Sequence, residues 1–195
     1  MSVNIVLKDK DRVYLAVDSQ GTCGDRRVTQ TNLNNIKMWK VDGATSCYIS
    51  HCGNIRDACV IRTMHNLVDE NENVDFNYVV KNVKRKIVQE LIDSDYLDVS
   101  NDYIDTISSS FFFVYKDKAY SIETDLSIVE VDNYEAHGSS RYIATGSLAS
   151  TVGLDPITRI KRALIASTNN IYVAFPVYVV DTKTNKMITI RKEDL

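Results

Sequence analysis

The hydrophobic period of this sequence changes twice, and that change limits the fold more than any other feature. Residues 3–7 and 12–18 alternate apolar and polar positions around a charged turn, as the two strands of a hairpin do. Between residues 57 and 91, apolar residues instead recur every three or four positions, which predicts two amphipathic helices. Strand-like runs then return at 108–115, 118–123 and 126–131.

The remaining elements are predicted from local signals. A second strand pair is expected at 34–41 and 45–52, and a glycine-containing turn at 20–25. The run 141–147 predicts a short strand, and Asp155 followed by Pro156 predicts a helix start. Final strands are expected at 171–180 and 186–191, with Pro176 marking an edge or a bulge. The run Phe-Phe-Phe-Val at 111–114 lacks alternation, which predicts a strand covered on both faces.

The order of these elements predicts an α+β fold. Helices are grouped between runs of hairpin-connected strands, which argues against alternating βαβ units. Two antiparallel sheets packed face to face, with helices outside both, would bury every apolar face. We therefore predict a four-layer αββα sandwich, formed by residues 1–195 as a single domain.

Composition excludes several functional classes. The formal net charge is −3 and the basic cluster at 81–86 lies in a helical pattern, so neither nucleic acid nor a membrane surface is indicated as a partner. No run approaches the roughly 20 apolar residues of a membrane span, and no signal peptide is apparent. The four cysteines are irregularly spaced, which favours reduced thiols and a cytoplasmic location. Cys47, His51 and Cys52 fit no standard zinc pattern, so we expect no metal and no cofactor.

Five short pieces together carry a resemblance: Ser2, the stretches 13–25 and 34–37, and the stretches 50–58 and 142–150. In this order and spacing the sequence resembles the proteasome β-subunit family of N-terminal nucleophile (Ntn) hydrolases, including its bacterial ring-protease relatives. The resemblance implies the same αββα sandwich. It also implies a peptidase whose first mature residue, Thr or Ser, attacks the peptide carbonyl while its own α-amino group acts as the general base.

The resemblance transfers four catalytic positions to this chain. Ser2 lies sixteen residues before Asp18, which matches the family spacing between the nucleophile and the acidic residue, and removal of Met1 would expose its amine. Asp18 would orient the catalytic lysine and the terminus. Gly53 would donate the backbone N–H of the oxyanion hole. Ser147, in the Gly146–Ser147 pair, would help to relay protons near the amine.

One position departs from the family pattern. The best local alignment places Asn35 where the family has its catalytic lysine, and Lys37 follows on the same predicted strand face. The acidic and serine residues that the family carries after its last major helix also have no clear match near Asn169 and Asn170. Three functions stay open: an N-terminal serine peptidase, a catalytically inactive self-assembling homologue, and a hydrolase of small amides.

The resemblance also implies partners. A peptidase of this family would form a homo-oligomer of stacked rings and would act on peptides or unfolded proteins inside it. A ring-shaped AAA+ ATPase would deliver the substrates. The sequence itself contains no nucleotide-binding G-x-x-x-x-G-K-[ST] motif.

Overall fold

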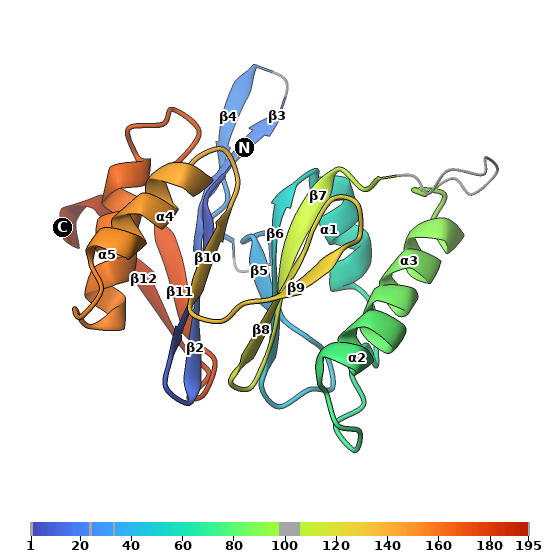
Figure 1. Ribbon diagram of the computed structural model, residues 1–195. Helices are drawn as coiled ribbons and strands as arrows, with labels where there is room; N and C mark the ends of the chain where they lie inside the picture. Colours follow the sequence, from blue (N-terminus) through green and yellow to red (C-terminus); the bar gives the residue numbers. More distant parts are fainter. Residues whose placement is uncertain (1, 24, 33, 98–105, 195) are drawn as a thin grey trace.

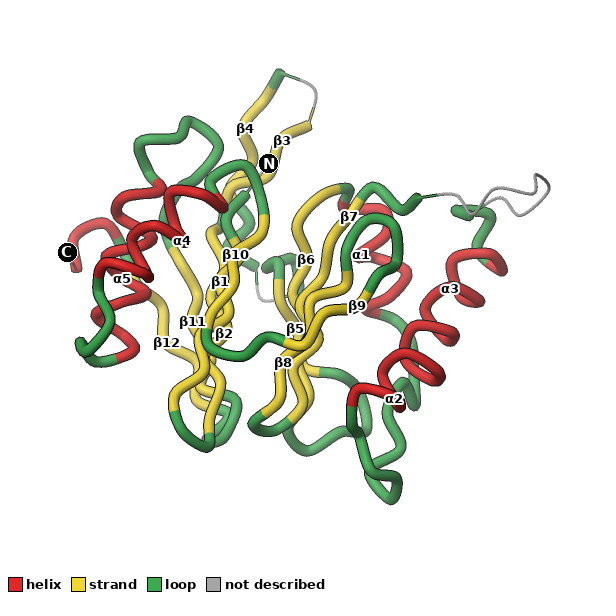
Figure 2. The backbone as a smooth tube through the Cα atoms, viewed as in Figure 1, coloured by secondary structure: helices red, strands yellow, loops and turns green. Residues whose placement is uncertain are grey.

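Two five-stranded antiparallel sheets pack face to face in the computed structural model of this chain, and helices lie outside both sheets (Figure 1). The structure describes residues 2–194, except residues 24, 33 and 98–105. The tube view shows the layers in the order helix, sheet, sheet, helix (Figure 2). The predicted α+β sandwich is therefore confirmed.

The first sheet holds the beginning of the chain. Its strand order is β10-β1-β2-β11-β12, and all of its pairings are antiparallel. Its strands are β1 (Asn4–Asp9), β2 (Arg12–Asp18), β10 (Tyr134–His137), β11 (Val177–Asp181) and β12 (Lys186–Ile190). In the β1–β2 hairpin Asn4 pairs with Val17, so the start of β1 lies beside the end of β2.

The second sheet has the strand order β5-β6-β7-β8-β9. Its strands are β5 (Met38–Lys40), β6 (Cys47–Gly53), β7 (Ser109–Tyr115), β8 (Lys118–Ile122) and β9 (Ile128–Glu130). A separate hairpin, formed by β3 (Gln20–Cys23) and β4 (Arg26–Thr29), projects from the body of the protein (Figure 1).

Helices cover the outer face of each sheet (Figure 1). The second sheet is covered by α1 (Ile55–Arg62), α2 (Phe76–Tyr78), the π-helical stretch η1 (Val79–Val83) and α3 (Lys84–Asp93). The first sheet is covered by α4 (Arg141–Ser150) and α5 (Pro156–Ser167), and the 3₁₀ turn η2 (Lys192–Asp194) follows β12. The predicted start of α5 is confirmed, because the Asp155 side chain accepts a hydrogen bond from the Thr158 N–H and Pro156 is the first helical residue.

Three apolar clusters fill the three spaces between the layers. One joins the second sheet to α1 and α3, and it includes Ile61, Ile87 and Phe111. Another joins the first sheet to α4 and α5. The third lies between the sheets and includes Phe112. Phe111, Phe112 and Phe113 are all fully buried and alternate between the outer and the inter-sheet cluster, so the prediction of a strand covered on both faces is confirmed.

Three predicted elements in the first half are wrong in extent, and one of them is the strand expected from residue 34, which begins only at Met38. The first helix ends at Arg62, whereas the apolar period continued to Leu67 and Val68. Both residues are buried in the same cluster as Ile61, but they reach it from a loop, so burial alone produced the helix-like spacing. The predicted turn at 20–25 is part of the projecting hairpin, whose second strand is exposed at every position and so carries no hydrophobic period.

Two further predictions are wrong in the second half. The run 141–147 belongs to helix α4, whose buried residues Ala144 and Leu148 are one helical turn apart. The strand expected at 171–180 begins only at Val177. Pro176 precedes it, and β11 pairs with β2 and β12, so Pro176 marks neither an edge nor a bulge. Within the described residues, no helix is long and apolar enough to cross a membrane.

Candidate active site

Ser2 is held at the end of the β1–β2 hairpin. The Asp18 N–H donates to the Val3 carbonyl at 3.2 Å, and the Val3 N–H donates to Asp18 Oδ1 at 3.0 Å. The Ser2 hydroxyl donates to the same Oδ1 at 3.0 Å. Both side chains are buried. The spacing of sixteen residues thus places them together because a tight antiparallel hairpin returns the chain to its starting point.

Lys37 completes a buried three-residue cluster. It lies immediately before β5, and its side chain is only 5% exposed. Lys37 Nζ donates to Asp18 Oδ1 at 2.6 Å and also to Ser2 Oγ. A buried ammonium needs a countercharge and acceptors, and here Asp18 and Ser2 supply them. A hydroxyl, an ammonium and a carboxylate therefore meet in one buried place.

Asp18 is oriented by donors on both of its oxygens. Oδ2 accepts from the Gln20 N–H at 3.0 Å and from the Ala174 N–H at 3.5 Å. The loop before β11 adds a further tie, because the Ser19 N–H donates to the Ala174 carbonyl at 3.2 Å. The carboxylate is thus fixed by backbone from two distant parts of the chain, and its remaining oxygen faces Ser2 and Lys37.

The assignment of Asn35 to the lysine position is wrong. Asn35 is exposed and lies in a turn, where its N–H donates to the Asn32 carbonyl at 2.8 Å. The strand predicted from residue 34 begins only at Met38, so Asn35 and Lys37 do not share a strand face. Lys37 contacts Ser2 and Asp18 directly. The chain therefore has a lysine in the cluster, which the alignment by residue count missed.

The glycine–serine pair beside Ser2 is also different from the predicted one. Ser147 lies inside α4, about 9 Å of helix beyond its first residue. Gly138, by contrast, packs against the Ser2 carbonyl, and the Ser139 hydroxyl donates to that carbonyl at 3.4 Å. Asn170 in turn donates from Nδ2 to the Ser139 carbonyl at 3.3 Å. The sequence did contain a signal for this contact, because the run Gly-Ser-Ser at 138–140 stands directly before helix α4.

Substitution of Gly138 should measurably lower the stability of the protein. Its φ is +100°, and a Cβ at this position would collide with the carbonyl group of Ser2 and contact Cys52 Sγ at 2.9 Å. We expect Gly138→Ala to lower the free energy of unfolding by about 1–3 kcal/mol, because the backbone is strained and Ser2 must shift. Thermal denaturation measures the loss. Gly146→Ala is the matched control, since a Cβ on Gly146 meets nothing within 4 Å; an equal loss in both variants would contradict this account.

Gly53 lines the same cleft as Ser2. The cleft holds about 150 Å³ and is also lined by Lys37, His51 and Gly21. Gly53 is the last residue of β6 and has φ +140°, and a Cβ there would collide with the backbone of Ser108. Its location at the cleft therefore requires glycine.

Two other titratable side chains lie close to the cluster. Burial, together with the positive charges of Lys37 and Arg62, lowers the pKa of His51 to about 3, so its imidazole is neutral at physiological pH. Burial raises the pKa of the Cys52 thiol. All four cysteines are free. In the part of the chain that the structure describes, no group of three or more His, Cys, Asp or Glu side chains is arranged to hold a metal ion.

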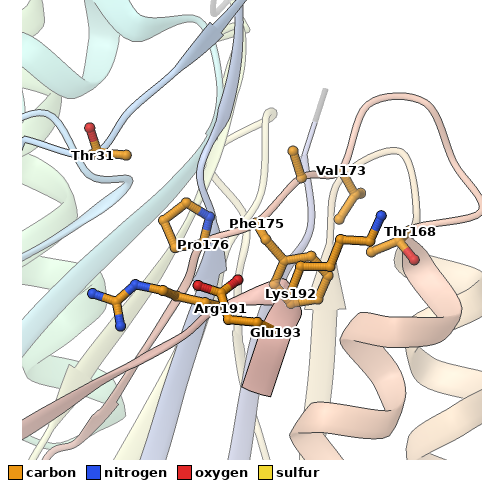
Figure 3. A pocket seen from close by; sticks show the side chains of 9 residues that line it. Thr31, Thr168, Val173, Phe175, Pro176, Arg191, Lys192 and Glu193 are labelled. Atoms are coloured by element: carbon orange, nitrogen blue, oxygen red, sulfur yellow. The ribbon is translucent and has the colours of Figure 1, made fainter. Parts of the chain in front are cut away.

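A larger cavity is lined in part by the loop that carries Ala174. It holds about 650 Å³, and Val173, Phe175, Pro176, Arg191 and Lys192 are among the residues that line it (Figure 3). Neither Ser2 nor Lys37 lines it. The reactive groups are therefore in the smaller cleft, and we place the candidate site there.

Comparison with known proteins gives matches by structure alone. No family model and no curated protein matches the sequence. The solved structure of BPH from Thiobacillus denitrificans has a TM-score of 0.73 at 17% identity, and the match covers 98% of this chain and 100% of that one. The chain has the proteasome-type Ntn-hydrolase fold. The predicted resemblance is thereby confirmed at the level of the fold.

Two further neighbours share this Ntn-hydrolase fold. Anbu (ancestral beta-subunit) from Yersinia bercovieri has a TM-score of 0.69 at 15% identity, and the match covers 98% of this chain and 88% of that one. HslV from Trypanosoma brucei has a TM-score of 0.63 at 16% identity, with 92% and 99% of the two chains covered. Identities this low support the architecture, so any chemistry must be argued from the residues of the site.

Proposed function

We propose that this chain is an N-terminal serine peptidase of the proteasome type, with Ser2 as its nucleophile once Met1 has been removed. Met1 itself lies outside the described residues. The observation that carries the proposal is the buried cluster in which Lys37 Nζ contacts both Ser2 Oγ and Asp18 Oδ1. A serine hydroxyl is a weak nucleophile on its own, and activated serines lie beside a base or a cation of this kind.

Each group has a chemical part in this proposal. The α-amino group of Ser2, with an unperturbed pKa of about 7.7–8.0, accepts the proton as Ser2 Oγ attacks the peptide carbonyl. The Lys37 ammonium favours the developing alkoxide, and Asp18 holds that ammonium in place. The Gly53 N–H, at the rim of the cleft, stabilises the oxyanion. The same amine then returns the proton to the leaving nitrogen, and water hydrolyses the ester formed on Ser2.

The position of Lys37 also weakens the alternative that the chain is a catalytically inactive homologue. That hypothesis depended on Asn35 standing in place of the lysine, whereas the lysine of the cluster is Lys37. No feature of the cleft favours small amides over peptides. The peptidase is therefore the function that the geometry supports best.

We further propose that the peptidase works as a homo-oligomer. Tyr142 and Val152 are 77% and 70% exposed, and Ile143 and Leu154 lie near them on the α4–α5 hairpin. Exposed apolar patches of this kind mark protein contacts. One structural neighbour, Anbu from Pseudomonas aeruginosa, was solved as a helical assembly. Stacked rings, a AAA+ unfoldase, unfolded-protein substrates and a cytoplasmic location follow from the family resemblance and complete the proposal.

The state of the N-terminus tests this proposal. We expect intact-mass spectrometry of the purified chain to show complete loss of Met1, because Ser2 is small and its amine must be free to act as the base. The same preparation should hydrolyse fluorogenic peptide amides. Light scattering on it measures the oligomeric state. Quantitative retention of Met1 in a preparation that still cleaves peptides would contradict the mechanism.

A further inference from the structure

A third cavity opens beside the cleft that Ser2 lines. It holds about 510 Å³ and shares Gln30, His51 and Ile55 with that cleft. Its other walls come from the end of β4, from the turn that follows it, and from one face of α1. A peptide whose carbonyl lies against Ser2 therefore has this cavity within reach of its side chain.

The described walls of this cavity carry no carboxylate and a single cationic side chain. Neither Asp, Glu nor Lys lines it, and Arg62 is its only charged residue. The two terminal nitrogens of the Arg62 guanidinium donate to the carbonyls of Asn34 and Ile36, and its central carbon lies 4.7 Å from the centre of the Trp39 ring. Its Nε is buried and has no hydrogen-bond partner among the described residues. The cavity therefore offers no countercharge to a basic side chain, and its one unpaired charged donor among the described residues is the Arg62 Nε–H.

Besides Arg62, two polar side chains in the walls are incompletely satisfied. Gln30 Oε1 and His51 Nδ1 are buried and have no hydrogen-bond partner among the described residues. Both residues line the cleft and the cavity, and both are more than nine-tenths buried. Buried polar atoms are normally paired, so each unpaired atom calls for an explanation. Since His51 is neutral, as described above, it offers either one donor or one acceptor at Nδ1, depending on its tautomer.

We propose that this cavity binds the side chain of the substrate residue whose carbonyl is attacked, and that Gln30 and His51 select a primary amide there, as in glutamine or asparagine. This inference rests on the proposed peptidase function and specifies its substrate. A primary amide carries two N–H donors and an acceptor, so it can satisfy Gln30 Oε1 together with either tautomer of His51. An apolar side chain would leave both groups unpaired, a carboxylate could not donate to Gln30 Oε1, and an ammonium would be buried without a countercharge.

A matched substrate series tests the selection. Four fluorogenic peptides, identical except for Gln, Met, Glu or Lys at this residue, are compared by kcat/KM on the full, processed chain. We expect the Gln peptide to exceed the Met peptide at least about tenfold, the Glu peptide to be poorer than the Gln peptide, and the Lys peptide to be poorer than the Met peptide. His51→Phe, which keeps a ring beside Trp39, and Gln30→Met, which keeps the side-chain length, should each move the Gln:Met ratio toward one.

The outcomes separate this inference from the proposed function. His65→Gln is the control, because His65 is exposed and pairs with Asp42 away from the site, and it should leave the ratio unchanged. Cleavage with equal or greater preference for Met, or an unchanged ratio in both His51→Phe and Gln30→Met, overturns the inference alone. Absence of all cleavage, together with no covalent labelling of Ser2 by an N-terminal-nucleophile inhibitor, overturns the proposed function and this inference with it.

Discussion

Replacing Ser2 by Ala is expected to reduce peptide cleavage to the uncatalysed background. The substitution removes one oxygen, the atom that we propose attacks the carbonyl, and leaves the backbone of the hairpin intact. Alanine is as small as serine, so Met1 should still be removed and the terminal amine should still be free. A loss of activity would therefore report on Ser2 Oγ and not on processing of the terminus.

Two further variants make this experiment specific. Ser2→Thr keeps a hydroxyl at the same position and should retain measurable cleavage. Ser150→Ala removes an exposed hydroxyl at the end of α4 and should leave the rate unchanged. Rates are measured with a fluorogenic peptide at saturating concentration. Residual cleavage in Ser2→Ala at more than a few per cent of the wild-type rate would contradict the assignment of the nucleophile.

The Lys37→Met variant is expected to lose activity and stability together. Met has nearly the same length and no charge, so the variant loses the ammonium that contacts Ser2 Oγ. We expect kcat to fall by about 10²–10³-fold, the cost typical of removing one group that stabilises developing negative charge. Asp18 also loses its buried countercharge, which should lower the free energy of unfolding by about 3–5 kcal/mol.

A double variant separates these two effects. In Lys37→Met with Asp18→Asn, no charge is left buried, so part of the stability should return while activity stays low. Lys40→Met is the control, because Lys40 is an exposed lysine three residues away on β5. Chemical denaturation and peptide kinetics measure the two quantities on the same samples. If the double variant recovers activity in step with stability, the role of Lys37 is structural and the proposed chemistry is wrong.

The parts of the site that sequence could predict are those fixed by local geometry. Ser2 and Asp18 are the two ends of one tight hairpin, so a count of residues was enough to place them together. Lys37 follows the projecting β3–β4 hairpin and an irregular turn, so a count of residues there pointed to Asn35 instead. The location of Lys37 depends on how that turn packs, and the hydrophobic periodicity of the sequence contains no information on this packing.

The same distinction holds for the second half of the chain. The helix at Pro156 and the buried strand of three phenylalanines were predicted because capping and burial on two faces leave local signals. The Gly138–Ser139 contact with Ser2 was missed because it joins segments more than 130 residues apart. Assigning 141–147 to a strand moved the expected glycine–serine pair to the wrong end of α4.

Covalent labelling tests the central claim most directly. An epoxyketone presents two electrophilic carbons, so it can bond to a hydroxyl and to an adjacent free amine; one structural neighbour, BPH from Thiobacillus denitrificans, was solved in complex with epoxomicin. After incubation with epoxomicin, mass spectrometry of the N-terminal peptide should show one adduct on a peptide that begins at Ser2, absent in Ser2→Ala and slower to form in Lys37→Met. An unlabelled wild-type chain, or an adduct on any residue other than Ser2, would contradict the account.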